Sequence, residues 1–233
     1  MLLSSLALIL VKKENMAAYE IWVGLGSNIE DRQSYLTAAI TKLNLITKKT
    51  IIMSSIYETP PWGGVADGPF LNQVVGVLVN SELLIHYCQL QSKYIEHVET
   101  LANSWIRLSH ALSVQSSQTT PEQFELYIAE LVMLYLLLVE LDLGRDRSNN
   151  AIRWSSRTID LDLLEMPYRK HKQLFRSPLL TLPHPRLHER QFVLVPWSEV
   201  APQLNLPTFN TSVADLQKSC LPNSEIKLWH AHS

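Results

Sequence analysis

The sequence predicts an α+β sandwich, in which a mainly antiparallel sheet carries helices on its faces. Apolar runs rich in β-branched residues, typical of strands, alternate with stretches whose apolar residues recur at helical spacing. Runs of strands interrupted by single helices favour an α+β class over a parallel α/β sheet. The length of 233 residues suits one domain, or one domain with an insertion, and a chain of this size can bury a core without disulfides.

The first third of the chain contains three predicted strands and one helix. Residues 19–25 form a buried strand, and the glycines at 24–27 predict a tight turn after it. The missing third glycine argues against a dinucleotide fingerprint there. Apolar residues at helical spacing predict a helix over 30–45. Strands follow at 51–57 and 70–79, separated by a loop dense in proline and glycine.

The middle of the chain has two helical patterns, at 81–103 and 120–143, joined by a polar segment at 109–120. Thr120 is a suitable N-cap for the second helix, since proline occupies the next position. This helix contains the apolar run LVMLYLLLV, which could indicate a membrane span. Acidic residues interrupt every 18-residue window around the run, so a helix in the protein core is the favoured interpretation.

The last third begins with a predicted strand at 157–164. Residues 191–195 lead into a short helix at 197–200, and the tail ends with a short helix and a strand at 226–229. The resulting order of strand, helix, strand, strand, helix, strand is that of a ferredoxin-like sandwich.

Composition excludes several classes of protein. The net charge is −2 and the lysines and arginines are scattered, so no nucleic-acid partner is expected. The two cysteines, Cys88 and Cys220, form neither a metal-type pair nor a disulfide framework, which suits a reducing cytoplasm. Residues 1–18 read as an N-terminal extension whose apolar run is too short to span a bilayer. A mis-called start, with Met16 as the true beginning, is the simpler interpretation of this extension.

The segment RWSSRTIDLDLL carries the strongest chemical signal. Asp160 and Asp162 lie two residues apart on a predicted strand, so their side chains point to the same face. Two carboxylates on one face repel each other unless a cation lies between them, and magnesium bound to phosphates is the common partner. The alternative is a solvated strand face paired with arginines such as Arg157.

Cationic side chains gather in two segments that flank this strand in sequence. Arginine forks suit phosphate oxygens, and carboxylates for magnesium together with arginines for phosphate are the components of phosphoryl transfer. A scattered set of surface charges is the alternative. The residues are Arg145, Arg147, Arg153, Arg157, His184, Arg186, His188 and Arg190.

A third group of residues could hold a flat heteroaromatic ring. Asn72 offers a donor and an acceptor on one planar head, and Phe70 and Trp62 offer stacking faces. Aromatic residues at the start of a strand are, alternatively, simply part of the core.

Together these motifs resemble the 6-hydroxymethyl-7,8-dihydropterin pyrophosphokinase family of folate biosynthesis. The resemblance covers most of residues 20–207 and rests on motifs that occur in family order. They are GLGSN at 24–28, YETPPWG at 57–63, FLNQVV at 70–75, LGRDR at 143–147, RWSSRTIDLDLL at 153–164 and LTLPHPRLHERQFVLVPWSEVAP at 180–202.

The resemblance implies transfer of pyrophosphate from ATP to the pterin hydroxymethyl group, with release of AMP. It implies that Asp160 and Asp162 bind two magnesium ions. The expected catalytic residues are these two with Arg157, His184 and Arg190. The expected pterin-site residues are Thr59, Pro60, Trp62, Phe70, Asn72, Trp154 and Phe192. The expected nucleotide-binding residues are Arg145, Arg147, Leu163 and Thr181, and Trp154 would lie with the two arginines on a closing loop.

The chain departs from the family between residues 79 and 144, where it is longer than one helix requires. We expect a single catalytic domain over 19–233, with a helical insertion at about 81–120 that packs outside the core. A cytoplasmic monomer that acts on ATP and the pterin is expected, without a nucleic-acid or membrane partner. A non-catalytic pterin- or nucleotide-binding module and a membrane-associated protein remain alternatives.

Overall fold

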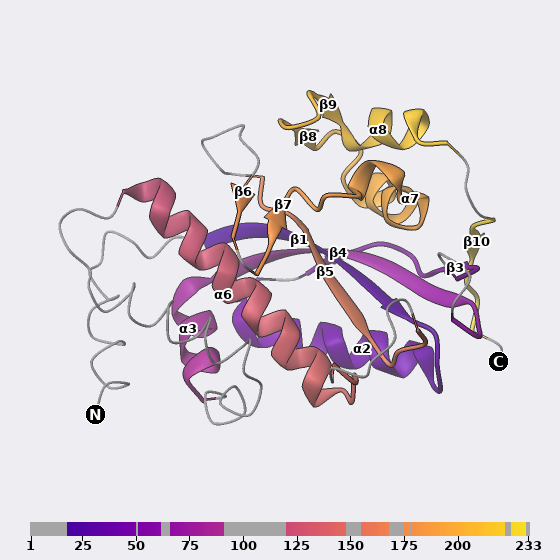
Figure 1. The fold of residues 1–233 in the computed structure, drawn as a ribbon, viewed down its shortest axis with the longest axis horizontal. Coiled ribbons are helices and arrows are strands. Elements are labelled where there is room, and N and C mark those ends of the chain that lie inside the picture. The colour runs from indigo at the N-terminus through magenta and orange to yellow at the C-terminus, as the bar shows by residue number, and fades with distance from the viewer. Residues whose placement is uncertain are drawn as a thin grey trace.

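The computed structural model describes residues 18–49, 51–61, 66–90, 120–147, 155–167, 175–177, 179–221 and 225–231. Its main sheet has the strand order β10-β3-β4-β1-β5, with β2 also paired to β4, and every pairing is antiparallel (Figure 1). The strands of this sheet are β1 (Ala18–Ser27), β2 (Ile52–Met53), β3 (Tyr57–Thr59), β4 (Phe70–Asn80), β5 (Asp160–Glu165) and β10 (Lys227–Leu228). Two small hairpins are formed by β6 (Phe175–Arg176) with β7 (Thr181–Leu182) and by β8 (Asn205–Leu206) with β9 (Thr211–Ser212).

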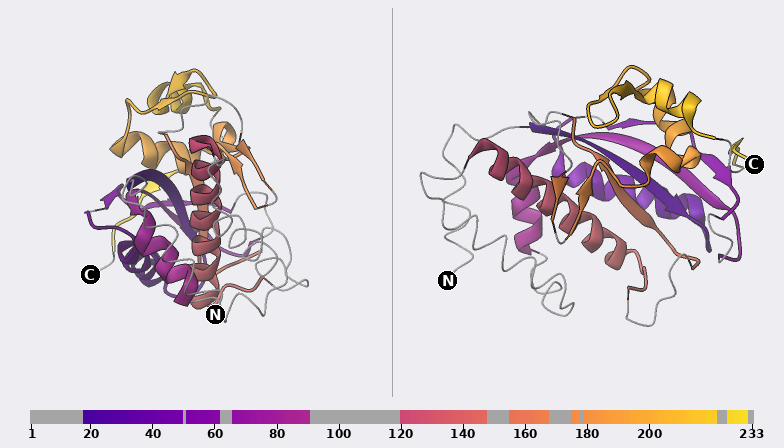
Figure 2. Two further views of the ribbon diagram at one scale, coloured as in Figure 1. Left: turned by 90° about the vertical axis from the view of Figure 1, so that its left-hand side faces the viewer. Right: turned by 45° about the horizontal axis from the view of Figure 1, so that its top comes forward.

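Helices cover both faces of the main sheet. Three lie on one face, and two lie on the other (Figures 1 and 2). The first group is α2 (Arg32–Leu43), α3 (Ser81–Leu90) and α6 (Pro121–Asp142), and the second is α7 (Gln191–Val200) and α8 (Val213–Ser219). Short 3-10 turns occur at Asn44–Ile46 and Leu187–Glu189. The predicted α+β class with a mainly antiparallel sheet is confirmed.

Each face of the sheet has its own apolar core. Under α7 and α8 the core is built around Trp22, whose ring centroid lies 5.8 Å from that of Trp197. Gly76 pairs with Trp22 across β4 and β1, and a Cβ atom at this glycine would come within 2.8 Å of the indole. Position 76 therefore has room only for glycine while the indole keeps its place.

Helix α6 is part of the core on the opposite face, as the sequence predicts. Thr120 caps it reciprocally: Thr120 Oγ1 accepts from the backbone N–H of Gln123, and Gln123 Oε1 accepts from the backbone N–H of Thr120. In the run Leu131–Val139 every side chain except that of Met133 is buried. Within the part of the chain that the structure describes, no helix is long and apolar enough to cross a bilayer.

Three expectations about the elements are wrong. The glycines at 24–27 form no tight turn, because β1 continues in extended conformation to Ser27. Residues 191–200 form one helix, although Pro196 lies inside it. The beginning of the segment at 81–103 does not pack outside the core, since Leu84 and Cys88 of α3 are fully buried against α6. The N-terminal extension 1–17 and the rest of the expected insertion, 91–119, lie outside the described residues.

Candidate active site

The middle of the sheet carries two glycines on the face that α7 partly covers. Strand β1 runs between β4 and β5, and Gly26 pairs with Asn72 on one side and with Asp160 on the other. Two residues earlier, Gly24 pairs with Asp162. Since side chains alternate between the two faces of a strand, all of these positions share one face. The glycines therefore leave a bare strip between an amide and two carboxylates.

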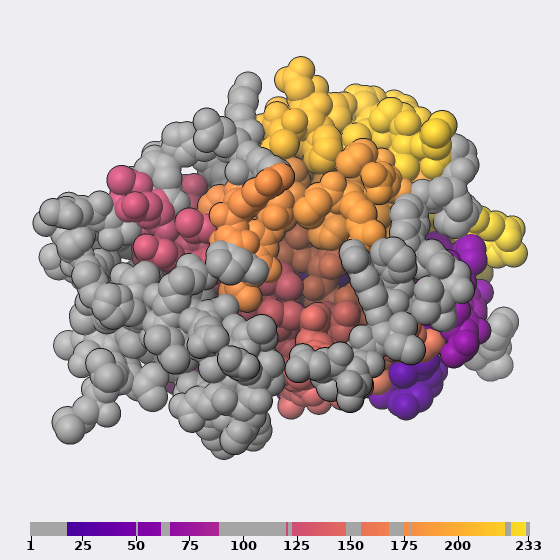
Figure 3. Space-filling model, viewed as in Figure 1, coloured from indigo at the N-terminus to yellow at the C-terminus, as the bar shows by residue number. Residues whose placement is uncertain are grey.

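A pocket opens over this strip. In the space-filling view the surface is hollowed below the segment that carries α7, with β5 at the bottom of the hollow (Figure 3). The walls come from the ends of β3, β4 and β5 and from the start of α7. The lining residues are Gly24, Leu25, Gly26, Thr59, Pro60, Phe70, Asn72, Gln73, Val74, Arg157, Asp160, Asp162, Arg190, Phe192 and Val193.

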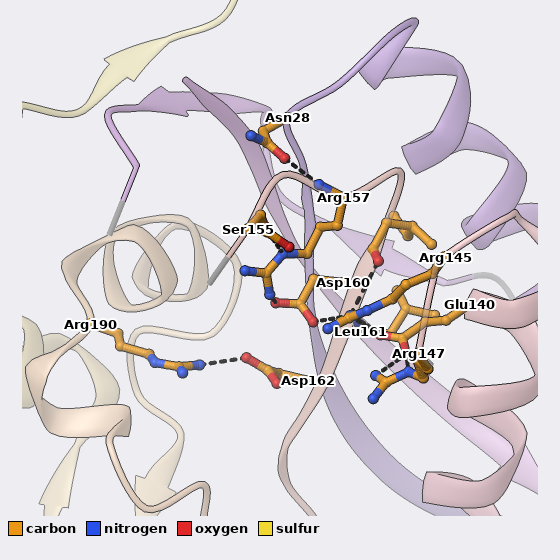
Figure 4. A network of polar contacts seen from close by, with 11 residues as sticks. Asn28, Glu140, Arg145, Arg147, Ser155, Arg157, Asp160, Leu161, Asp162 and Arg190 are labelled. Carbon is orange, nitrogen blue, oxygen red and sulfur yellow. Dashed lines mark hydrogen bonds and ion pairs between the residues drawn. The ribbon is translucent and has the colours of Figure 1, made fainter. Parts of the chain in front are cut away.

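The two aspartates on β5 are each paired with arginine (Figure 4). Arg157 Nη1 donates to Asp160 at 2.9 Å, and Arg145 forms a second ion pair with the same carboxylate. Asp162 is paired with Arg190. Burial favours the neutral acid at Asp160, but the charges of Arg145 and Arg157 outweigh it and lower the pKa of the carboxyl group. Both aspartate side chains keep 27–30% of their surface exposed, so the carboxylates remain accessible from the pocket.

Glu140, in the last turn of α6, lies behind this pair and is completely buried. Its carboxylate accepts from Arg145 at 2.6 Å, from Arg147 Nε at 2.7 Å and from the backbone N–H of Leu161 at 2.6 Å. Burial raises the pKa of Glu140 to about 7 against the opposing charges of the two arginines. One carboxylate thus ties the end of α6 and the arginine segment to the strand position between the two aspartates (Figure 4).

The opposite wall of the pocket presents an amide and aromatic rings. Asn72 Nδ2 donates to Thr59 Oγ1 at 2.8 Å and, more weakly, to the carbonyl of Phe70 at 3.4 Å. These bonds leave Asn72 Oδ1 as an acceptor beside Gly26, where a Cβ atom would lie 3.5 Å from it. The Arg157 guanidinium lies 5.5 Å from the centre of the Phe70 ring, so this arginine contacts both walls.

The segment before α7 contributes Arg190 and His184 to this region. Arg190 is only 9% exposed. Its guanidinium carbon lies 5.5 Å from the centre of the Phe192 ring, and the guanidinium pairs with Asp162. His184 is anchored by its backbone N–H, which donates to Leu164 O at 3.0 Å. Burial lowers the pKa of His184, although the charge of Asp162 opposes this shift.

The structure brings most of the predicted site residues into one place. Those in the pocket lining are Thr59, Pro60, Phe70, Asn72, Arg157, Asp160, Asp162, Arg190 and Phe192. Arg145 and Arg147 lie behind Asp160, at Glu140. Leu163 is buried in the core under α2, α3 and α6, and Thr181 lies on β7. Both are outside this lining, and their nucleotide contacts stay a prediction. Trp62, Trp154 and Arg153 lie outside the described residues.

Sequence reasoning missed two polar residues of this region, Glu140 and Asn28. In the sequence, Glu140 is one of the acidic residues that interrupt the apolar helix, and a carboxylate buried in such a helix is itself a signal for cationic partners. Asn28 ends the GLGSN motif and is only 7% exposed. Its amide hydrogen-bonds to residues more than 100 positions away, which no local pattern indicates.

Comparison with known proteins agrees with this site. A family model described as 7,8-dihydro-6-hydroxymethylpterin-pyrophosphokinase (HPPK) matches residues 22–107 and 114–202, which include every pocket residue named above.

Three curated relatives are named 2-amino-4-hydroxy-6-hydroxymethyldihydropteridine pyrophosphokinase. That of Porphyromonas gingivalis (strain W83) is 31% identical over 186 residues, covering 79% of this chain and 92% of the relative. That of Bacillus subtilis (strain 168) is 30% identical over 184 residues, covering 78% of each chain. That of Aquifex aeolicus (strain VF5) is 27% identical over 197 residues, covering 84% of this chain and 89% of the relative.

The family model spans more than half of the sequence, and the motifs it matches form one pocket. The chain therefore belongs to the 7,8-dihydro-6-hydroxymethylpterin-pyrophosphokinase family.

Proposed function

We propose that this protein transfers pyrophosphate from ATP to 6-hydroxymethyl-7,8-dihydropterin, giving AMP and the pterin diphosphate in folate biosynthesis. Family membership and the names of the relatives support this reaction. The observation that carries it is the two-sided pocket: an amide and aromatic rings face two carboxylates and their arginines across a bare glycine strip.

The amide wall is suited to the pterin. Asn72 Oδ1 can accept from an N–H group on the edge of a flat heteroaromatic ring, because its Nδ2 is already held by Thr59. Phe70 and Phe192 supply ring faces, and Pro60 also lines the pocket. Trp62 and Trp154 are proposed to complete this site, as the motifs imply.

The cationic wall is suited to the triphosphate. Arg157 and Arg190 reach into the pocket, and guanidinium groups pair with phosphate oxygens in a bidentate manner. His184, Arg145 and Arg147 stand behind them as further phosphate partners, and Leu163 and Thr181 are proposed to contact the nucleotide. In the structure the arginines neutralise the two aspartates, and we expect them to exchange part of this pairing for phosphate when ATP binds.

The residues present fit magnesium. Among the residues that the structure describes, no group of three or more His, Cys, Asp or Glu could hold a metal ion, so only the Asp160 and Asp162 carboxylates are offered. This is the donor set that magnesium commonly uses, since it takes one or two carboxylates and completes its shell with phosphate oxygens and water. When bound there, magnesium would neutralise the charge on the transferred phosphates; we propose two ions.

The transfer itself requires positioning more than covalent chemistry by the protein. The pterin hydroxymethyl oxygen forms a bond to the β-phosphorus of ATP while the bond from that phosphorus to the α,β-bridging oxygen breaks. AMP leaves with the electron pair, and the hydroxyl proton passes to solvent. The arginines stabilise the charge that builds up on the bridging oxygen and on the β,γ-phosphates.

An assay of AMP release tests this proposal. The purified chain with ATP, the pterin and magnesium should release AMP in equal amount to the pterin diphosphate. Release of ADP would mean transfer of a single phosphoryl group and would overturn the proposal. Pterin binding measured by calorimetry without turnover would instead indicate a binding module.

Further proposals concern the scaffold and the setting of the enzyme. The sheet order β3-β4-β1-β5, with α2 and α6 on one face, supports a ferredoxin-like sandwich as the scaffold. We propose that the enzyme acts as a cytoplasmic monomer. The net charge of −2 supports the absence of a nucleic-acid partner.

A further inference from the structure

The turn that follows β1 contains a buried amide which the proposed reaction does not use directly. Asn28, the last residue of the GLGSN motif, is 7% exposed and lies next to the pocket lining without belonging to it. Buried amides are retained where each of their polar atoms has a partner. The partners of Asn28 therefore indicate what it does.

Asn28 holds the backbone of Arg157 at two points. Asn28 Oδ1 accepts from the backbone N–H of Arg157 at 2.7 Å (Figure 4), and the backbone N–H of Asn28 donates to the carbonyl of Arg157 at 3.2 Å. Bonds to the peptide groups on both sides of the Arg157 Cα atom fix the position and the direction of the backbone from which the arginine side chain extends. Arg157 lies before β5 begins, so no strand ladder holds it.

The amide nitrogen of Asn28 connects these two segments to a third one, which precedes β4. Asn28 Nδ2 donates to Ser156 Oγ at 3.0 Å and, more weakly, to the carbonyl of Gly68 at 3.4 Å. Ser156 Oγ also accepts from the backbone N–H of Asp67 at 3.2 Å. One side chain therefore links the turn after β1, the segment before β4 and the segment before β5.

These three segments carry both walls of the pocket. The segment before β4 leads directly to Phe70, and the segment before β5 carries Arg157. The Arg157 guanidinium lies 2.9 Å from Asp160 and 5.5 Å from the centre of the Phe70 ring, so its position depends on how the two segments are set against each other.

We propose that Asn28 is a positioning residue, whose amide sets the Arg157 guanidinium between the carboxylate wall and the aromatic wall. The catalytic role of the Arg157 guanidinium rests on the proposed function, whereas the hydrogen bonds that position it are observed in the structure. The amide is required because one side chain must both accept from Arg157 N and donate to Gly68 O and Ser156 Oγ. Alanine provides neither group.

The test is a double-mutant cycle with steady-state kinetics of AMP release and calorimetry of magnesium–ATP binding. Asn28→Ala should lower kcat/KM by about 10- to 100-fold, the cost expected when a charged group is misplaced by about an ångström. In an Arg157→Ala background the same change should cost less than about twofold, because contacting residues are not additive. Asn80→Ala is the matched control: its side chain also accepts a backbone N–H, from Leu83 at 3.0 Å, but at the start of α3.

Two results would overturn the proposal. Asn28→Ala could keep more than half of the wild-type kcat/KM, or its loss could be undiminished in the Arg157→Ala background. If Asn28→Ala does not fold by circular dichroism, Ser156→Ala takes its place in the same cycle, and an additive or absent effect there counts against the proposal. If the wild type releases no AMP, the proposed function fails, while the coupling of Asn28 to Arg157 can still be measured in the affinity for magnesium–ATP.

Discussion

At the scale of single residues, the site depends on the absence of side chains at two glycines of β1. Gly24 and Gly26 lie on the pocket face of β1, between the residues of β4 and those of β5. A side chain at Gly26 would stand between Asn72 and Asp160, and one at Gly24 would stand between Val74 and Asp162. The glycine spacing of two, which on the sequence resembles a turn, is the spacing of one strand face. We infer that the substrates meet over this strip.

Gly26→Ala should therefore impair function strongly without unfolding the protein. The added methyl group would lie 3.5 Å from Asn72 Oδ1, 3.6 Å from Phe70 and 3.9 Å from Asp160, which are ordinary van der Waals contacts. We expect stability within about 1 kcal/mol of wild type. We expect kcat/KM for the pterin to fall by about 100-fold, since the methyl group displaces the ring from its place. Thermal unfolding and AMP release measure the two quantities.

Gly24→Ala is the matched comparison, because its methyl group would meet Leu164 at 3.4 Å. It should lose less activity than Gly26→Ala. Equal kinetics for wild type and Gly26→Ala would place the pterin elsewhere.

At the scale of elements, local pattern and long-range pairing contributed differently to what could be predicted. The continuous apolar runs of β1 and β4 and the capped apolar helix α6 are patterns of neighbouring residues, so the sequence predicts these elements correctly. The Asp160 and Asp162 face was predictable for the same reason. The role of Glu140 was not, since its partner Leu161 lies 21 positions away and only the packing of α6 on β5 brings them together.

Glu140→Gln should destabilise the junction between α6 and β5. An amide offers one acceptor atom to the three residues that donate to Glu140, and it turns its own N–H groups toward at least one of them. Leaving a buried donor without a partner costs about 1–3 kcal/mol, which should appear as a lower midpoint in urea unfolding. Asp142→Asn is the control on the same helix, because its side chain is 60% exposed and its carboxylate pairs with Lys42 at the surface. That change should lower the free energy of unfolding by less than about 1 kcal/mol. Equal losses of stability in the two variants would show that the buried cluster around Glu140 does not stabilise the protein.

At the scale of the whole molecule, one sheet separates the larger apolar core from the face that holds the pocket and the proposed site, which we call the functional face. The face under α2, α3 and α6 holds the larger apolar core. The opposite face is covered by α7 and α8 over only part of its length, and the pocket occupies the part beside the start of α7 (Figures 1 and 3). Asp160 and Asp162 belong to this functional face, and their charges are already balanced by arginines.

Removal of divalent cations should consequently stop turnover and leave the fold intact. With excess EDTA we expect AMP release to disappear and to return when magnesium is added. The unfolding temperature should change by less than about 2 °C, since a ligand stabilises a protein only by its binding free energy and the arginines already compensate the carboxylates. A large drop in unfolding temperature with EDTA would show that a metal ion is part of the folded structure.

The most direct test of pyrophosphate transfer follows the β-phosphate. With ATP labelled at the β-phosphorus, magnesium and 6-hydroxymethyl-7,8-dihydropterin, the label should move entirely to the pterin product, and Asp162→Asn should prevent this movement. Label that remains in the nucleotide as ADP, or transfer that is unchanged in Asp162→Asn, would contradict the proposed reaction or the role of the carboxylate pair.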